Sequence, residues 1–344
     1  MKEESEVRSQ KSEVSQTQAR RFADQKSEEN QPATSNLQPA TASSIHVRIA
    51  TRKSKLALWQ ANWVKGRLES LGHSAELVLV ETQGDKTQDD NKPFAQMAGQ
   101  GFFTKAVQDA VLANHADMAV HSHKDLPSMP FAGLEIAAVT ERADARDVLI
   151  AKKEGRRKSE EKEASSIFNL PSSIVIGTSA VRRQRQLLAL RPDLTVKELR
   201  GNVPTRVQKL RDGQYDAIVL AAAGLERLEL DLSDLEVIVL EPDVMMPAPA
   251  QGVLALETRR YAYRIASILT ELHDIHTYKA VAAERGLMSM LQGGCQLALG
   301  AYATYKNGVV KLRAWYEGDT VEVENPSSEG AAMLAFEALG RPTV

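Results

Sequence analysis

Charged side chains crowd together at one point of the sequence, in the stretch AVHSHKDLPS (residues 119–128). The mostly apolar residues 117–120 lead into this stretch, and Pro127 interrupts it. The pattern predicts a buried strand that ends in charged residues where a loop begins. Ligands of α/β sheets bind beyond such strand ends, so Asp125, next to Lys124, is a candidate for stabilising a cationic intermediate. A plain surface ion pair is the alternative.

Two histidines of the same stretch invite a metal hypothesis. His121 and His123 are two residues apart, so on an extended strand they would share a face. The sequence offers no further cluster of histidine or cysteine beside them, and we predict no metal site. The glycine-rich run 98–101 is not followed by Gly-Lys-Ser/Thr, which argues against a nucleotide triphosphatase.

Arginines follow three successive strand ends in the second half of the chain, in GTSAVRR (177–183), LRGNVPTR (199–206) and GLER (224–227). Arginine pairs with carboxylate or phosphate through two parallel hydrogen bonds, and a helix start offers free N–H groups. A single such turn is most often only solvated helix charge, but three alike predict a polyanion site. The stretch ATRKSK (50–55) can face the same cleft. The candidates are Arg52, Ser54, Arg182, Arg183, Arg200, Arg206 and Arg227.

Cys295 is the single cysteine of the chain, in LQGGCQ (291–296). A lone cysteine most often behaves as a small buried hydrophobic residue. The two preceding glycines favour an exposed turn instead, where a thiolate could act as a nucleophile or an attachment point.

Composition limits the classes of protein to which the chain can belong. Its 344 residues are 43% hydrophobic and 26% charged, with a net charge of −2, which is typical of soluble globular domains. No stretch is apolar enough to span a membrane, and the net charge provides no field for nucleic acid. One cysteine suits a reducing compartment, so we expect a cytoplasmic protein. The polar residues 1–44 resemble neither a secretory nor a mitochondrial signal, and we predict a disordered tail.

Strands and helices alternate from residue 46 onward, and the alternation restarts after the charged run 152–163. The predicted strands are 47–50, 75–81, 117–121, 136–139, 148–151, 173–177, 195–199, 217–221, 253–258, 298–304 and 309–316. The predicted helices are 54–71, with Ser54 as its N-cap, 103–114, 180–190, 205–212, 279–291 and 331–339.

This order predicts two doubly wound α/β domains, of the kind found in periplasmic binding proteins, and a small α+β domain at the C-terminus. The first domain is expected to comprise 45–145 and 247–265, the second 146–246 and the third 266–344.

Six motifs together resemble one family, hydroxymethylbilane synthase, also called porphobilinogen deaminase. In chain order they are IATRKSKLALWQA, AVHSHKDLPS, GTSAVRRQRQL, LRGNVPTR, DAIVLAAAGLERL and AERGLMSMLQGGCQ, and the resemblance covers residues 46–305. It implies a transferase of tetrapyrrole and haem synthesis. Such an enzyme joins four porphobilinogen molecules head to tail with loss of ammonia, and water then releases the linear product, hydroxymethylbilane. It also implies a dipyrromethane cofactor, made of two porphobilinogen units and bound to a cysteine through a thioether.

The resemblance assigns roles to individual residues. Cys295 would hold the cofactor, and Asp125 with Lys124 would act in catalysis, Asp125 by stabilising the azafulvenium cation that loss of ammonia produces. The carboxylates of the cofactor would be bound by Lys124, Thr178, Ser179, Arg182, Arg183, Arg206 and Arg227. Those of the substrate would be bound by Arg52, Ser54, Arg200 and Arg206.

The sequence departs from the family pattern at four positions: Gln96 and Gln100 replace lysines, Ala180 replaces a serine and Ala250 replaces a glycine. None of these changes involves Cys295 or Asp125, so the predicted activity stands. A non-catalytic carboxylate-binding protein of the two-domain periplasmic type is the alternative. A nucleic-acid binder is disfavoured by an aromatic content of 5%. Beyond the substrate we expect no partner, and a monomer.

Overall fold

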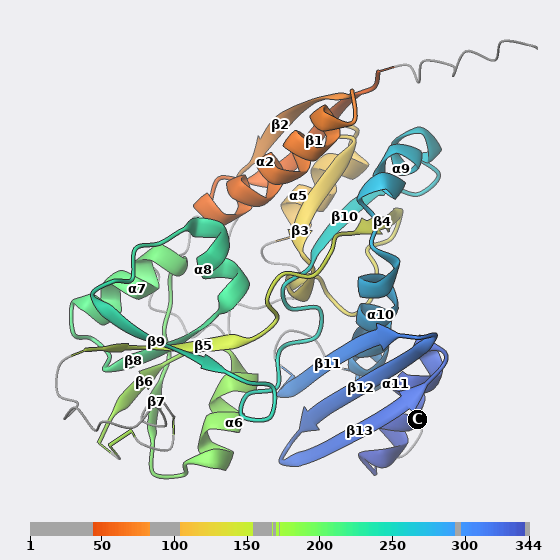
Figure 1. Ribbon diagram of the computed structural model, residues 1–344. Coiled ribbons are helices and arrows are strands. Elements are labelled where there is room, and N and C mark those ends of the chain that lie inside the picture. Colours follow the sequence, from red (N-terminus) through yellow and green to blue (C-terminus); the bar gives the residue numbers. More distant parts are fainter. Residues whose placement is uncertain are drawn as a thin grey trace, which may run out of the picture. The chain divides into compact units, whose positions relative to one another are not determined.

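The structure is a computed structural model that describes residues 44–82, 104–153, 167, 170–171, 173–292 and 297–340 (Figure 1). Several predictions concern residues outside these ranges. They are the tail, most of the charged run 152–163, Gln96, Gln100 and Cys295.

The first sheet has five strands in the order β2-β1-β3-β10-β4. Their bounds are β2 (Ser74–Val80), β1 (His46–Arg52), β3 (Met118–Ser122), β10 (Leu254–Arg259) and β4 (Leu134–Val139). β1 is parallel to β2 and β3, whereas β10 is antiparallel to both of its neighbours. The sheet is therefore mostly parallel, as predicted.

Helices cover both faces of this sheet, because its strands carry apolar residues on both sides. The helices are α2 (Lys55–Ser70), α5 (Lys105–Leu112) and α9 (Tyr263–Leu269). Met118 and Val120 of β3 pack into the core that α2 covers, whereas Ala119 between them packs into the core that α5 covers. This alternation follows from the two-residue period of a strand.

The second sheet has five strands in the order β7-β6-β8-β5-β9. Its strands are β7 (Thr195–Lys197), β6 (Val175–Gly177), β8 (Ala217–Ala221), β5 (Asp147–Lys152) and β9 (Leu235–Leu240), and its helices are α6 (Val181–Leu190), α7 (Val203–Arg211) and α8 (Ala222–Leu228). β6 is parallel to β7 and β8, and β5 is antiparallel to β8 and β9. The two large sheets are thus built alike, each with one antiparallel strand among parallel ones.

The third sheet is antiparallel, with β11 (Leu299–Lys306), β12 (Val309–Tyr316) and β13 (Asp319–Asn325) in sequence order. Two helices, α10 (Ile275–Met290) and α11 (Ser328–Ala338), share one core with it. α10 begins four residues before the predicted start, because the Asp274 side chain accepts a hydrogen bond of 2.6 Å from the backbone N–H of Thr277 and caps the helix there.

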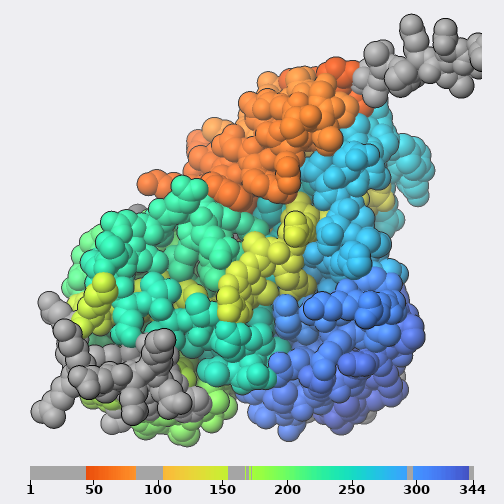
Figure 2. Space-filling model, viewed as in Figure 1, coloured from red at the N-terminus to blue at the C-terminus, as the bar shows by residue number. Residues whose placement is uncertain are grey.

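The chain passes twice between the two large sheets. The first crossing, residues 140–146, joins β4 to β5, and the second crossing, residues 241–253, joins β9 to β10. In Figure 2 yellow residues, a colour that includes the first crossing and its neighbouring strands, lie at the surface between green-to-teal and blue parts of the chain. The predicted fold class is confirmed, whereas the exact domain boundaries stay a prediction.

Candidate active site

Lys124 and Asp125 lie on a single 3-10 turn, η1 (His123–Asp125), directly after β3. The second crossing fixes this turn. The backbone N–H of His123 donates to the carbonyl of Val253 at 2.9 Å, and Lys124 Nζ donates to Gln251 Oε1 at 3.2 Å. His123 is buried while the Asp125 side chain is exposed. The sequence therefore folds into a rigid turn that presents one accessible carboxylate.

Lys124 has an unusual electrostatic environment. Burial lowers the pKa of its ammonium group from 10.5 to about 8; the nearby Arg183 and Arg182 lower it as well, whereas Asp125 and Asp147 act in the opposite direction. Burial also lowers the pKa of Arg206 to about 10, again with a contribution from Arg183 and against the attraction of Asp125. The carboxylate of Asp125 thus interacts electrostatically with cations from both large sheets.

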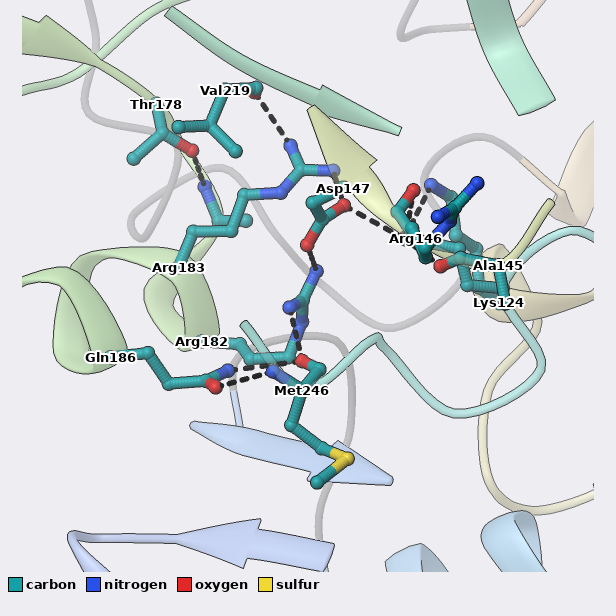
Figure 3. A network of polar contacts seen from close by, with 12 residues as sticks. Lys124, Ala145, Arg146, Asp147, Thr178, Arg182, Arg183, Gln186, Val219 and Met246 are labelled. Carbon is teal, nitrogen blue, oxygen red and sulfur yellow. Dashed lines mark hydrogen bonds and ion pairs between the residues drawn. The ribbon is translucent and has the colours of Figure 1, made fainter. Parts of the chain in front are cut away.

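Arg182 and Arg183 are both held by one internal carboxylate, that of Asp147 (Figure 3). Arg182 Nη2 lies 2.7 Å from Asp147 Oδ2, and Arg183 Nη2 lies 2.8 Å from Oδ1. Gln251 Nε2 donates to the same Oδ1 at 2.8 Å. Burial by itself raises the pKa of Asp147, but the two guanidinium groups outweigh it and hold that pKa well below its usual range.

This internal carboxylate was missing from the sequence prediction, in which the two arginines bound only the cofactor. Asp147 is the first residue of β5, and Gln251 lies in the second crossing. The only signal in the sequence is an acidic residue directly before the apolar run VLIA.

Other cations near this cluster have uncharged hydrogen-bond acceptors. Arg206 Nε donates to the carbonyl of Gly201 at 2.7 Å, and Arg227 Nη2 donates to that of Gly252 at 2.7 Å. Lys124 donates to an amide oxygen, as described above. Within the described part of the chain, the buried Nε of Arg183 has no hydrogen-bond partner. The donor set carries surplus positive charge and suits a ligand with several carboxylates.

Ser54, predicted as both a helix cap and a ligand of the substrate, does cap α2. Its Oγ accepts a hydrogen bond of 3.4 Å from the backbone N–H of Ala57. The same helix contacts α8 of the second sheet, where Arg227 lies 5.8 Å from the centre of the Trp59 ring. Arg52 ends β1 just before this cap, so α2 brings this part of the first sheet towards Arg227.

Thr178 and Ser179 lie in the turn between β6 and α6. Thr178 is buried, and its Oγ1 accepts a hydrogen bond of 3.3 Å from the backbone N–H of Ala180, whereas Ser179 is partly buried. Ala180 is the N-cap residue of α6, and its side chain provides no capping hydrogen bond. At the next strand–helix turn, Arg200 Nε donates to Glu198 Oε1 at 3.0 Å.

The two histidines belong to the protein interior. His121 Nε2 lies 3.1 Å from Glu257 Oε2, and Gln108 Nε2 donates to the other oxygen of this carboxylate at 3.0 Å. Burial, with Arg285 and Arg142 nearby, keeps the pKa of His123 well below 6.5. The ranges described above contain no group of three or more His, Cys, Asp or Glu residues that could hold a metal ion.

A cavity of about 420 Å³ lies elsewhere, beside the two crossings. Its lining residues are Arg142, Ala143, Asp144, Ala145, Arg146, Glu241, Pro242 and Tyr302. None of them is a predicted site residue, so we define the candidate site by the cluster around Asp125 and Asp147. In the same described ranges, no helix is both long and apolar enough to cross a bilayer.

Comparisons with known proteins give a consistent result. Residues 47–267 match the family model "Porphobilinogen deaminase, dipyromethane cofactor binding domain", and residues 278–322 match "Porphobilinogen deaminase, C-terminal domain". Three proteins named porphobilinogen deaminase are similar to this chain. The one from Lachnospira eligens is 41% identical over 307 residues, which cover 86% of this chain and 99% of that protein. The one from Maridesulfovibrio salexigens is 43% identical (77% and 82% covered), and the one from Syntrophotalea carbinolica is 46% identical (76% and 79% covered).

Among solved structures, the BvgS VFT2 domain of Bordetella pertussis aligns with 70% of this chain and 91% of its own length, at 16% identity and a TM-score of 0.40.

Proposed function

The chain belongs to the porphobilinogen deaminase family, and from this membership we propose how its residues carry out the reaction of the family. The protein is a transferase, a hydroxymethylbilane synthase. It joins four porphobilinogen molecules head to tail with loss of ammonia and releases the linear tetrapyrrole with water. The alternative of a non-catalytic carboxylate-binding protein is not favoured, because both family models match.

The protein uses a dipyrromethane cofactor, and the donor set described above fits such a group. Each of its two pyrrole units bears an acetate and a propionate, so it is a polycarboxylate. Three cations, Lys124, Arg206 and Arg227, make hydrogen bonds to uncharged acceptors. Together with Arg182 and Arg183 they outnumber the carboxylates of Asp125 and Asp147, which leaves net positive charge for a ligand. When bound, the cofactor supplies the free pyrrole carbon to which the first substrate is joined.

Attachment through Cys295 is part of the proposal. Cys295 lies outside the described residues, in the segment between the end of α10 at Met290 and the start of β11 at Leu299. Support comes from the sequence, because Cys295 is the single cysteine of the chain and a thiolate is a far better nucleophile than a hydroxyl group.

We assign the catalytic role to Asp125, supported by Lys124. Loss of ammonia leaves positive charge spread over the pyrrole nitrogen and the exocyclic carbon of the substrate. A carboxylate fixed in advance next to that position stabilises the charge without having to reorganise. The accessible Asp125 on its fixed turn has this property, and it is the observation on which the proposal rests.

The remaining arginines bind carboxylates of the cofactor and the growing chain. Asp147 and Gln251 orient Arg182 and Arg183, while the unpartnered Nε of Arg183 remains a donor. Thr178 and Ser179 add hydrogen bonds to the cofactor at the start of α6, and the substrate is bound by Arg52, Ser54, Arg200 and Arg206.

We further propose that the protein is a cytoplasmic monomer. The single cysteine supports a reducing compartment. Light scattering of the purified protein tests the monomer: a mass of twice 37.7 kDa would contradict it.

Replacing Asp125 by Asn tests the catalytic assignment. We expect kcat to fall by about 10²–10³, the range for loss of one preorganised electrostatic group. Intact-mass spectra should still show two pyrrole units above the chain mass, because cofactor attachment and fold do not depend on this carboxylate. Asp319→Asn, at an exposed position of β13, is the matched control and should keep full activity. A kcat of Asp125→Asn within a few-fold of the wild type contradicts the assignment.

A further inference from the structure

Two consecutive residues of α10 bind different parts of the molecule. Glu284 is buried and accepts hydrogen bonds from the backbone N–H groups of Ala250 and Ala303, each at 2.7 Å, and from Arg142 Nη2 at 2.8 Å. It therefore ties α10 to both crossings and to β11. Arg285, the next residue, points its guanidinium group towards the turn η1.

Arg285 makes three hydrogen bonds to backbone carbonyls on either side of Asp125. Its Nη1 donates to the carbonyls of His123 and Leu126, both at 3.3 Å, and its Nη2 donates to that of Pro127 at 2.5 Å. One guanidinium group thus spans the turn, from the residue two positions before Asp125 to the residue two positions after it. A lysine could not do the same, because its ammonium group lacks this planar arrangement of donors.

The turn is consequently fixed on two sides. The second crossing holds it through the hydrogen bonds to Val253 and Gln251, and α10 holds it through Arg285. Only the Asp125 side chain in this turn is exposed, while its neighbours His123 and Leu126 are buried. The position of the carboxylate is therefore set by the backbone of the turn, and small displacements of a catalytic group have large effects on rate.

We propose that Arg285 is a positioning residue for the reaction. It fixes the carboxylate of Asp125 relative to α10, the helix that leads into the segment carrying Cys295. The inference rests on the proposed function, since it needs Asp125 to be the catalytic carboxylate. Arg285 itself touches neither substrate nor cofactor in this role.

A double-mutant cycle tests the inference, with Arg285→Gln, Asp125→Asn and the double variant compared with the wild type. For Arg285→Gln we expect kcat to fall by about 10–100-fold, with KM within about threefold and the dipyrromethane mass retained. Arg285→Lys, which keeps the charge and part of the donor set, should recover some of this loss. In the Asp125→Asn background, Arg285→Gln should lower kcat by less than about threefold, because the carboxylate that Arg285 positions is absent.

Arg259→Gln is the matched control. Arg259 Nη1 also donates to two backbone carbonyls, those of Val111 and Ala116, each at 2.7 Å, but these lie away from η1. This variant should lower the melting temperature without lowering kcat. If Arg285→Gln does not fold, Arg285→Lys takes its place in the cycle.

Three outcomes overturn the inference. One is a kcat of the Arg285 variant within twofold of the wild type. Another is a double variant whose loss equals the product of the two single losses, which would mean that the residues act independently. The third is an equal loss of kcat in Arg259→Gln. An Asp125→Asn variant with normal turnover overturns the proposed function together with the inference, so the two failures can be told apart.

Discussion

Replacing Asp147 by Asn should destabilise the protein strongly, because two buried guanidinium groups would lose their shared counter-charge. Arg182, Arg183 and Asp147 are at most 5% exposed, and the charged hydrogen bonds between them measure 2.7 and 2.8 Å. Removing one partner of a buried ion pair costs about 3–5 kcal/mol. The asparagine oxygen can still accept one hydrogen bond, so we expect this range and not twice its value. In a protein of this size, it corresponds to a melting temperature lower by roughly 4–7 °C.

The difference in stability between the wild type and Asp147→Asn should depend on pH in a defined direction. Burial raises the pKa of Asp147, but Arg182 and Arg183 outweigh burial, and the pKa in the folded state is well below its usual range. In the unfolded chain it is about 3.9. The carboxylate therefore contributes its full stability above that pH, and the contribution is lost as pH falls through the folded-state value. The difference in melting temperature between wild type and Asp147→Asn should be constant near neutral pH and should become smaller below about pH 4.

Thermal unfolding followed by circular dichroism at pH 7 and at several acidic pH values provides the assay. Asp193→Asn is the control, because Asp193 pairs with Arg191 at an exposed position and should leave the melting temperature unchanged. The effect of Asp147→Asn should be larger in a Cys295→Ser background, since cofactor carboxylates would otherwise supply a replacement counter-charge. A melting temperature equal to that of the control, or a gap that persists unchanged below pH 4, would refute the reasoning.

Three further predictions follow from the same structure. Ala180→Ser should stabilise the protein by about 0.5–1 kcal/mol in chemical denaturation, because α6 lacks a capping side chain; no gain would show that a hydroxyl there does not cap. The pKa of Lys124 is about 8, so its ammonium group is charged below this pH and neutral above it. Cofactor assembly in the apoprotein, followed as gain of mass, should therefore slow as pH rises through 8, and a Lys124→Arg variant with the same pH profile would contradict this. Deletion of residues 1–44 should change neither melting temperature nor activity, and a drop of several degrees would contradict the prediction that this polar segment is disordered.

The elements of the two α/β sheets could largely be predicted from the sequence, because their buried strands are short apolar runs bounded by polar turns. Among the described elements, those that were not predicted are β9, β13, α8, α9 and the 3-10 helices η1 and η3 (Thr270–Leu272). β9, with the sequence LEVIVL, has an apolar pattern from which it could have been predicted. β13 differs, because it lies at a sheet edge and has the sequence DTVEVEN, in which no residue is fully buried. An edge strand is held by backbone hydrogen bonds, and these leave little trace in the pattern of apolar residues.

The candidate arginines could be selected from the sequence for a different reason: parallel strands bring their carboxyl ends to one edge of a sheet, and these arginines follow such strand ends. The position of Asp147 depends instead on strand direction, which a short apolar run does not reveal. Since β5 is antiparallel to β8, its first residue pairs with Ala221 at the end of β8, and Asp147 therefore lies among the helix starts. The antiparallel β10 acts likewise in the first sheet, where Leu254 pairs with Ser122 and places Gln251 beside Lys124. The sequence pattern pointed to the arginines, whose role as ligands stays a prediction, but it did not point to Asp147 and Gln251, which contact Arg182, Arg183 and Lys124.

The position of β10 between β3 and β4 has a consequence for synthesis on the ribosome. All five strands of the second sheet leave the ribosome in one uninterrupted stretch, 147–240, whereas the first sheet lacks an inner strand until residues 254–259 have been made. Domains generally fold as units during translation. The second sheet can therefore be complete while one edge of β3, with its apolar Met118–Val120, still has unpaired backbone N–H and C=O groups. In the nascent chain, β3 and β4 both lack the strand that lies between them, and a ribosome that stalls before β10 would release a chain exposed at these edges.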